Sequence, residues 1–265
     1  MINRFAVMGN PISHSLSPLI HQRFAEQTGI ELSYEKLLVP EAFFEAQVLD
    51  FFTQGGKGLN ITLPFKQRAF AMARVHTPRA LQAKAVNTLW ISEDQLHADN
   101  TDGIGLIRDL GHYLNLAEKQ VLLLGAGGAA RGIIGPLLDA GIGKLIIANR
   151  TEEKAHLLRA DFAQILCSPL SELKNDFDLI INATSASLME EDMGIPYSLL
   201  KPTTLCYDLA YNRQHPTAFV KWAKEQGVVG VDGLGMLVEQ AAEAFFIWNG
   251  IMPDVPAVLR ELRQT

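Results

Sequence analysis

Residues 120–138 read QVLLLGAGGAARGIIGPLL, an apolar run followed by a glycine-rich turn and a stretch typical of a helix. Gly125 permits a tight turn, Gly127 lets the backbone approach a phosphate, and Ala130 is small enough for close helix packing. A glycine turn used only for packing is the alternative. The strand before the turn and the helix after it favour a unit that binds a dinucleotide pyrophosphate at the helix N-terminus.

Further apolar strands follow this unit at 144–150, 177–185 and 204–210, with helical stretches at 151–162 and 215–227 between them. Near-continuous apolar strands are typical of a parallel sheet that helices cover on both faces. The pattern predicts a Rossmann-type dinucleotide-binding domain over residues 104–235.

The first hundred residues form a second α/β pattern. Strands are expected at 4–9, 32–39 and 58–64, helices at 15–29 and 40–56, and a hairpin at 85–100. The alternation of polar and apolar residues in 58–64 predicts a half-buried strand. In the first helix Ser17 is the candidate N-cap, Pro18 the first helical residue and Gly29 the residue just past the end. We expect an N-terminal α/β domain over 1–103 with a mainly parallel sheet, and a cleft between it and the second domain.

Composition excludes several classes of protein. The 265 residues carry a net charge of −6, which argues against a nucleic-acid partner. No apolar run is long enough for a membrane helix, and the N-terminus does not resemble a signal peptide. Two cysteines without a Cys/His cluster argue against a metal site and favour reduced thiols in the cytoplasm.

The end of the strand at 144–150 indicates which dinucleotide is bound. NAD-binding units usually place an acid there to bond the ribose 2′-hydroxyl. This chain has Asn149, Arg150 and Thr151, followed by Lys154. The two cations suit a 2′-phosphate, so the pattern predicts NADP(H), with Glu152 and Glu153 expected to face solvent.

The stretch NITLPFK at 60–66 ends on a candidate catalytic lysine. A nicotinamide enzyme that reduces a ketone needs a group to deliver a proton to the oxygen, and Lys66 can do this if a carboxylate orients it. Asp102 and Asp99, both in HADNTDG at 97–103, are the candidate partners. The spacing alone does not choose between them, and Asp102 also suits a helix N-cap.

Eight motifs occur in one order along the chain: GNPISHSLSP, NITLPFK, AVNTL, DNTDG, GAGGAAR, NRT, INATS and DGLGMLVEQAA. In this set and order the chain resembles the shikimate dehydrogenase family. The resemblance implies reversible, NADPH-dependent reduction of 3-dehydroshikimate to shikimate, on the route to chorismate and the aromatic amino acids. It also implies that Lys66 and Asp102 form the catalytic pair, and that helices within 236–265 complete the first domain.

The resemblance assigns further site residues. Those implied to hold the substrate are Ser15, Ser17, Thr62, Asn87, Tyr211 and Gln240. Those implied to hold the cofactor are Gly125, Ala126, Gly127, Gly128, Ala129, Asn149, Arg150, Thr151, Lys154, Leu209 and Gly233. Hydroxyl and amide groups dominate the first set, which suits a small polyol acid.

The chain departs from the family pattern at four positions. Lys84 and Ser187 stand where glycine is usual, Leu209 where methionine is frequent and Lys154 where arginine is common. Lys84 is expected to alter the backbone near Asn87. The rival interpretations are a quinate/shikimate dehydrogenase that uses NAD or both cofactors, an inactive NADP sensor and a folate dehydrogenase. As partners we expect a small-molecule substrate only, with the protein a monomer or homodimer.

Overall fold

The computed structural model describes residues 2–174, 176–184 and 194–264, so the expectation for Ser187 lies outside the described residues. The chain divides into two compact units, residues 1–105 with 238–264 and residues 106–237. Both divisions fall within helices, α5 (Asp102–Leu110) and α9 (Leu234–Asn249). The α/β fold class expected from the sequence is confirmed.

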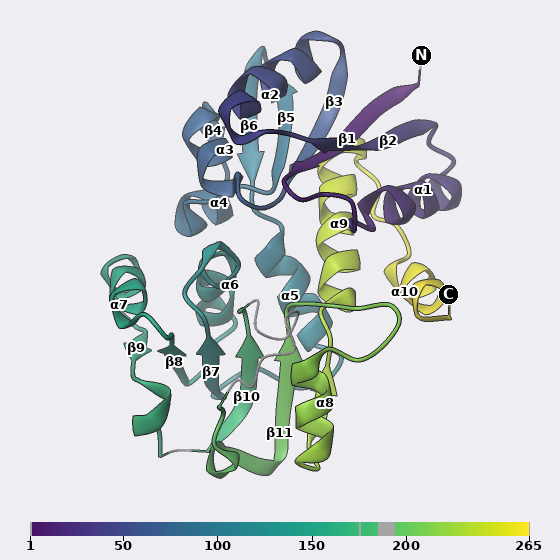
Figure 1. The fold of residues 1–265 in the computed structure, drawn as a ribbon. Helices are drawn as coiled ribbons and strands as arrows, with labels where there is room; N and C mark the ends of the chain where they lie inside the picture. Colours follow the sequence, from purple (N-terminus) through teal and green to yellow (C-terminus); the bar gives the residue numbers. More distant parts are fainter. Residues whose placement is uncertain (1, 175, 185–193, 265) are drawn as a thin grey trace. The chain divides into compact units, whose positions relative to one another are not determined.

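The first unit contains a six-stranded sheet in the order β2-β1-β3-β5-β6-β4, in which parallel pairs outnumber antiparallel ones (Figure 1). The β5–β6 hairpin is confirmed. In chain order, its elements are β1 (Asn3–Gly9), α1 (Ser17–Thr28), β2 (Leu32–Leu38), the short η1 (Glu41–Phe43), α2 (Phe44–Thr53), β3 (Gly56–Ile61), α3 (Lys66–Met72), β4 (Val75–His76), α4 (Pro78–Ala83), β5 (Thr88–Ser92), β6 (Gln95–Asp99), parts of α5 and α9, and α10 (Val255–Gln264).

Strand β3 corrects one expectation. Leu59, Asn60 and Ile61 are all buried, so the alternating pattern does not mark a half-buried strand. β3 lies inside the sheet between β1 and β5, and α9 packs on it through the Trp248 ring, which would collide with a Cβ at Gly58. Asn60 therefore points into protein, where it must find hydrogen-bond partners.

The second unit contains a fully parallel sheet in the order β12-β11-β10-β7-β8-β9, the doubly wound arrangement of a Rossmann domain. In chain order, its elements after α5 are β7 (Gln120–Leu124), α6 (Gly128–Asp139), β8 (Lys144–Ala148), α7 (Glu152–Asp161), β9 (Leu166–Cys167), η2 (Leu170–Glu172), β10 (Phe177–Asn182), η4 (Tyr197–Leu199), β11 (Leu200–Asp208), α8 (Ala218–Glu225) and β12 (Val229–Val231).

The core of the second unit explains the apolar strands. Val121 and Leu123 of β7 belong to one buried cluster, whereas Leu122 and Leu124 belong to another. Successive side chains of a strand point to opposite faces, so both faces of this sheet are covered. The carboxyl ends of β7 and β8 are thereby fixed beside the glycine turn and the Asn149 segment. Among the described residues no helix is long and apolar enough to cross a membrane.

Candidate active site

Lys66 stands at the first residue of α3, directly after a turn tied to the sheet. The Thr62 N–H donates to the Met8 carbonyl at 2.9 Å, and the Val86 N–H donates to the Lys66 carbonyl at 2.8 Å. Phe65 is fully buried and its ring stacks on Phe44 at 4.4 Å. The backbone of Lys66 is thus anchored from both sides, and its side chain is only 17% exposed.

The Lys66 ammonium donates to Asp102 Oδ2 at 2.5 Å. The Asp102 side chain is 9% exposed. At the start of α5, the backbone N–H of Asp102 donates to Asn100 Oδ1 at 3.1 Å. Because an ammonium carries three hydrogens, a contact with one carboxylate oxygen leaves donors to aim elsewhere. Within the described part of the chain, Lys66 forms its ion pair with Asp102.

Asp99, the other candidate carboxylate, serves a different cation. Arg79 donates to both of its oxygens, at 3.1 and 2.5 Å, and Thr77 donates to Oδ1 at 2.6 Å. Arg79 also bonds Glu243 of α9 at 2.9 Å. Desolvation opposes the charged guanidinium, yet its two acidic partners raise the pKa of Arg79. Asp99 therefore pairs with Arg79 and Thr77, whereas Lys66 pairs with Asp102.

Asn87 contacts the other side of Asp102. Its Oδ1 accepts the Thr101 N–H at 2.8 Å, and its Nδ2 donates to Asp102 Oδ1 at 2.8 Å. The same Nδ2 lies 3.2 Å from Oε1 of Gln240, which α9 contributes. The structure thus brings Lys66, Asp102, Asn87 and Gln240 together within the first unit.

Ser15 and Ser17 lie side by side at the start of α1, with their hydroxyl oxygens 3.1 Å apart. The expectation that Ser17 is the N-cap is wrong: the helix begins at Ser17 itself, Leu16 is the cap residue, and the cap makes no side-chain hydrogen bond. Ser17 is buried, and its hydroxyl does not cap the helix. Thr62, the remaining candidate in this unit, is half-buried on the turn before Lys66.

Four polar residues of this region escape the sequence analysis: Tyr34, Asn60, Thr88 and Thr101. Tyr34 Oη donates to Asn60 Oδ1 at 2.7 Å, and Asn60 Nδ2 donates to Thr88 Oγ1 at 3.2 Å. Asn60 and Thr101 stand inside the motifs NITLPFK and DNTDG. The sequence pattern predicted that the polar face of strand 58–64 is exposed, so it gave no reason to expect a buried, hydrogen-bonded Asn60.

His21 of α1 is fully buried among aromatic rings. Its ring stacks on Tyr34 at 4.3 Å and lies 5.5 Å from Trp248. Neither ring nitrogen makes a hydrogen bond of normal geometry with a described residue, although the Asn60 amide lies close enough to act on it. Burial lowers the pKa of His21 to about 3, against the smaller opposing effect of Asn60. The imidazole is therefore neutral in the folded protein.

This neutral histidine predicts acid sensitivity. The unfolded chain binds a proton at His21 below about pH 6.5, whereas the folded chain does so only near pH 3. The contribution of the neutral His21 to the free energy of unfolding is therefore complete above pH 6.5 and is lost as the pH falls. At pH 5 the loss is about 2 kcal/mol. Urea unfolding of wild type and His21→Phe at pH 7 and 5 measures it. Equal pH dependence in the two proteins would contradict a buried neutral His21.

The glycine turn of the second unit has room for a phosphate. Gly125 has φ 105°, which favours glycine, and a Cβ there would press on Ala183. Gly127 has φ −86°, which any residue adopts, and a Cβ there would meet no described atom within 4 Å. Neither backbone conformation nor packing requires glycine at 127. The open space at Gly127 would let a ligand approach the N-terminus of α6, which Gly128 and Ala129 begin.

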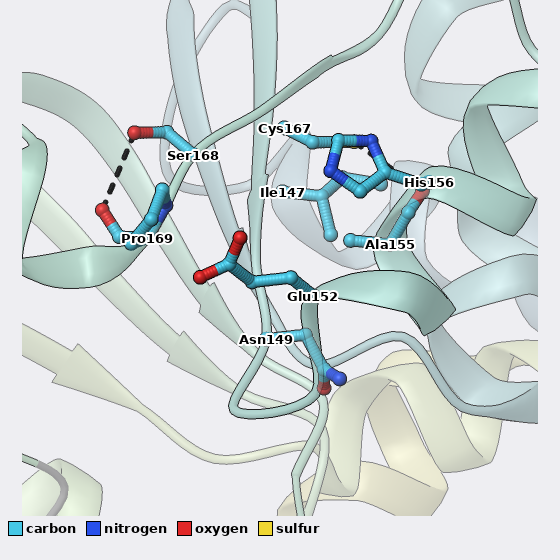
Figure 2. A pocket seen from close by; sticks show the side chains of 8 residues that line it. All are labelled: Ile147, Asn149, Glu152, Ala155, His156, Cys167, Ser168 and Pro169. Carbon is cyan, nitrogen blue, oxygen red and sulfur yellow. Dashed lines mark hydrogen bonds between the residues drawn. The ribbon is translucent and has the colours of Figure 1, made fainter.

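The end of β8 forms the side of a shallow pocket (Figure 2), lined by Ile147, Asn149, Glu152, Ala155, His156, Cys167, Ser168 and Pro169. Asn149 Nδ2 donates to the Thr151 carbonyl at 2.7 Å and holds the bend before α7. Arg150, Thr151 and Lys154 are exposed at this bend. Glu152 is exposed, as expected, and its side chain also lines the pocket. Arg150, Thr151 and Lys154 offer hydrogen-bond donors, and residue 149 is not an acid, so the bend suits a phosphate on the ribose.

Gly233 and Leu209 lie close together in the second unit. A Cβ at Gly233 would lie 2.3 Å from the Leu209 carbonyl oxygen, so backbone packing by itself requires glycine. Ala126 and Leu209 pack on the same apolar cluster. Tyr211 is half-buried after β11 and belongs to this second unit.

Lys84 caps α4 with φ 46° and ψ 35°, the left-handed conformation that glycine adopts readily. A side chain there costs about 1 kcal/mol. Lys84 thus adopts a backbone conformation that glycine also allows, and the expected change near Asn87 stays a prediction.

The chain is similar to known proteins over nearly its whole length. Three family models match: "Shikimate dehydrogenase substrate binding domain" over residues 7–89, "Shikimate / quinate 5-dehydrogenase" over 109–214 and "Shikimate 5'-dehydrogenase C-terminal domain" over 233–263. A curated shikimate dehydrogenase (NADP(+)) of Legionella pneumophila strain Lens is 60% identical over 99% of both chains. The structure of an Ael1 enzyme from Pseudomonas putida has TM-score 0.92 and 45% identity over 98% of both chains. That of the Thermus thermophilus enzyme, in complex with NADP(H) and shikimate, has TM-score 0.89 and 33% identity over 99% of both.

Proposed function

Because this chain belongs to the shikimate dehydrogenase family, we propose that Lys66 and Asp102 are its catalytic pair. The chain catalyses the reversible NADPH-dependent reduction of 3-dehydroshikimate to shikimate, in chorismate and aromatic amino acid biosynthesis. The observation that carries the residue assignment is the 2.5 Å contact between the Lys66 ammonium and Asp102 on a backbone anchored at both ends.

When bound, NADPH would supply the hydride that the carbonyl carbon accepts. As the carbon–oxygen π bond breaks, Lys66 Nζ gives a proton to the oxygen, and in the reverse reaction it takes the proton from the shikimate hydroxyl. Asp102 directs the ammonium, and Asn87 fixes Asp102 from its other oxygen. Positioning of this kind supplies much of the rate enhancement of such enzymes.

We assign the other groups by chemistry. Ser15 and Ser17 offer adjacent hydroxyls to the substrate carboxylate, while Thr62, Asn87 and Gln240 offer donors and acceptors to the ring hydroxyls. Tyr211 keeps the assignment that the family resemblance gives it, as a substrate-binding residue. Residues 1–103 with 236–265 bind substrate, and residues 104–235 bind NADP(H).

For the cofactor, the turn over Gly125–Ala129 accommodates the pyrophosphate. Arg150, with Asn149, Thr151 and Lys154, accommodates the 2′-phosphate, while Leu209 and Gly233 are assigned to the nicotinamide. Both cysteines are free thiols, which agrees with the cytoplasmic location that we propose. We also propose that the protein acts as a monomer or homodimer.

The test of function is the absorbance of reduced nicotinamide when purified protein is mixed with shikimate or quinate and NADP⁺ or NAD⁺. Turnover of shikimate with NADP⁺ supports the proposal. Comparable turnover of quinate or with NAD⁺ would move it to the broader quinate/shikimate activity. NADP⁺ binding without any turnover would leave a sensor.

The role of Arg150 predicts a change in cofactor preference. Loss of one exposed charge-assisted hydrogen bond raises the KM for NADP⁺ about tenfold in Arg150→Met, while kcat/KM for NAD⁺ stays within about twofold. The matched control is Arg159→Met, which removes another exposed arginine from the end of α7. An unchanged KM for NADP⁺ in Arg150→Met, or an equal rise in both variants, would refute a specific 2′-phosphate contact.

A further inference from the structure

A line of hydrogen bonds leads from Tyr34 to the proposed catalytic pair. Tyr34 Oη donates to Asn60 Oδ1 at 2.7 Å. Asn60 Nδ2 donates to the Asn87 carbonyl at 3.0 Å and to Thr88 Oγ1 at 3.2 Å, and Thr88 Oγ1 donates to Asn87 Oδ1 at 2.9 Å. Asn87 Nδ2 then reaches Asp102. The members from Asn60 to Asp102 are all buried.

Backbone groups fix the direction of these bonds. The Asn87 carbonyl can only accept, so the Asn60 atom facing it is the amide nitrogen and the one facing Tyr34 is the oxygen. The Thr101 N–H can only donate, so the Asn87 atom facing it is the oxygen and Nδ2 points to Asp102. Neither amide can be reversed without breaking a bond to the backbone.

Tyr34 stands where this line meets the serine pair. The residue is half-buried as a whole, but its hydroxyl end is enclosed. Burial raises the pKa of this hydroxyl well above its ordinary value, and a hydrogen bond with Ser17 opposes the rise. His21 fixes the ring by stacking on it, with an interplanar angle of 11°. This hydroxyl donates to Asn60 Oδ1, and Ser17 lies close enough to act on its pKa.

We propose that Tyr34 is a positioning residue whose hydroxyl holds the serine end and the Asn87–Asp102 end of the substrate site in register. The proposal rests on the function assigned to that site. Removal of the hydroxyl leaves Asn60 Oδ1 without this buried donor, and Asn60 then no longer holds a single orientation against Asn87 and Thr88. Substrate binding weakens, whereas the chemistry at Lys66 is preserved.

The test is steady-state kinetics of Tyr34→Phe, which keeps the ring and its stacking on His21. The expected result is a rise of about tenfold in the KM for shikimate, the equivalent of one hydrogen bond. The kcat should stay within about twofold, and the KM for NADP⁺ should not change. A purely structural role would instead lower the melting temperature and kcat at an unchanged KM for shikimate, and this outcome would overturn the proposal.

A matched control and a second variant sharpen the result. Tyr207 is a fully buried tyrosine of the second unit whose hydroxyl donates to Asp109 Oδ2 at 2.5 Å. Tyr207→Phe removes a similar bond and should leave the KM for shikimate unchanged. Thr88→Val interrupts the same line of hydrogen bonds further along. In the double variant Tyr34→Phe/Thr88→Val, the KM for shikimate should therefore rise no more than about as much as in the more affected single variant. Additive losses would show that Tyr34 does not act through Thr88.

Failure of this proposal is distinct from failure of the assigned function. If the wild type oxidises shikimate with NADP⁺ and Tyr34→Phe has the wild-type KM, the positioning role is refuted and the function stands. If the wild type does not oxidise shikimate, the function fails and the proposal fails with it.

Discussion

The Lys66→Met variant is expected to lose about 10²- to 10⁴-fold in kcat for shikimate oxidation, the usual contribution of a positioned general acid or base. Methionine keeps the length and apolar stem of the side chain but cannot exchange a proton. Because Lys66 is not among the residues assigned to NADP(H), the affinity for NADP⁺ should stay within about twofold. Stopped-flow absorbance and calorimetric titration with NADP⁺ measure the two quantities.

The matched control is Lys57→Met, which removes an exposed lysine from β3, the strand that leads to Lys66. It should retain wild-type kcat. A Lys66→Met enzyme with more than a tenth of wild-type kcat would remove the lysine from the chemistry, and so would an equal loss in the control.

Asp102→Asn is expected to have the second-largest effect, a loss of about 10²- to 10³-fold in kcat/KM for shikimate. Both Asp102 oxygens accept hydrogen bonds, one from Lys66 and one from Asn87. An asparagine offers one oxygen and one amide nitrogen, so one of the two donors must then face another donor. Either the lysine loses its orienting partner or Asn87 does.

Thermal unfolding of Asp102→Asn separates this effect from misfolding, since the isosteric amide should leave a folded protein. The variant should remain cooperative in unfolding and bind NADP⁺ as the wild type does. Activity within about tenfold of wild type would mean that the carboxylate does not orient Lys66.

The sequence predicted the second unit well because its signals are local. An apolar strand, a glycine turn and a helix follow one another directly, and each is confirmed by β7, Gly125 and α6. The absence of an acid at residue 149 is likewise read from one position. Such features require no knowledge of what packs against them.

The site around Lys66 depends on contacts that spacing does not encode. Spacing alone does not choose between Asp99 and Asp102, although the family resemblance favours Asp102. The structure separates the two because Arg79 donates hydrogen bonds to both oxygens of Asp99. Asn60 was missed because the alternating pattern suggested an exposed polar face, whereas neighbouring strands and α9 cover it. Tyr34 gives no signal at all, since a tyrosine on a strand is ordinary until its hydroxyl is seen to reach Asn60.

The most direct test of the central claim, that Lys66 and Asp102 act as one catalytic unit, is a double-mutant cycle. It compares kcat/KM for shikimate in wild type, Lys66→Met, Asp102→Asn and the variant with both changes, at saturating NADP⁺. If Asp102 acts through Lys66, the double variant should be no slower than about the slower single variant. A double variant whose loss equals the product of the two single losses would show that the residues act independently, and would contradict this account.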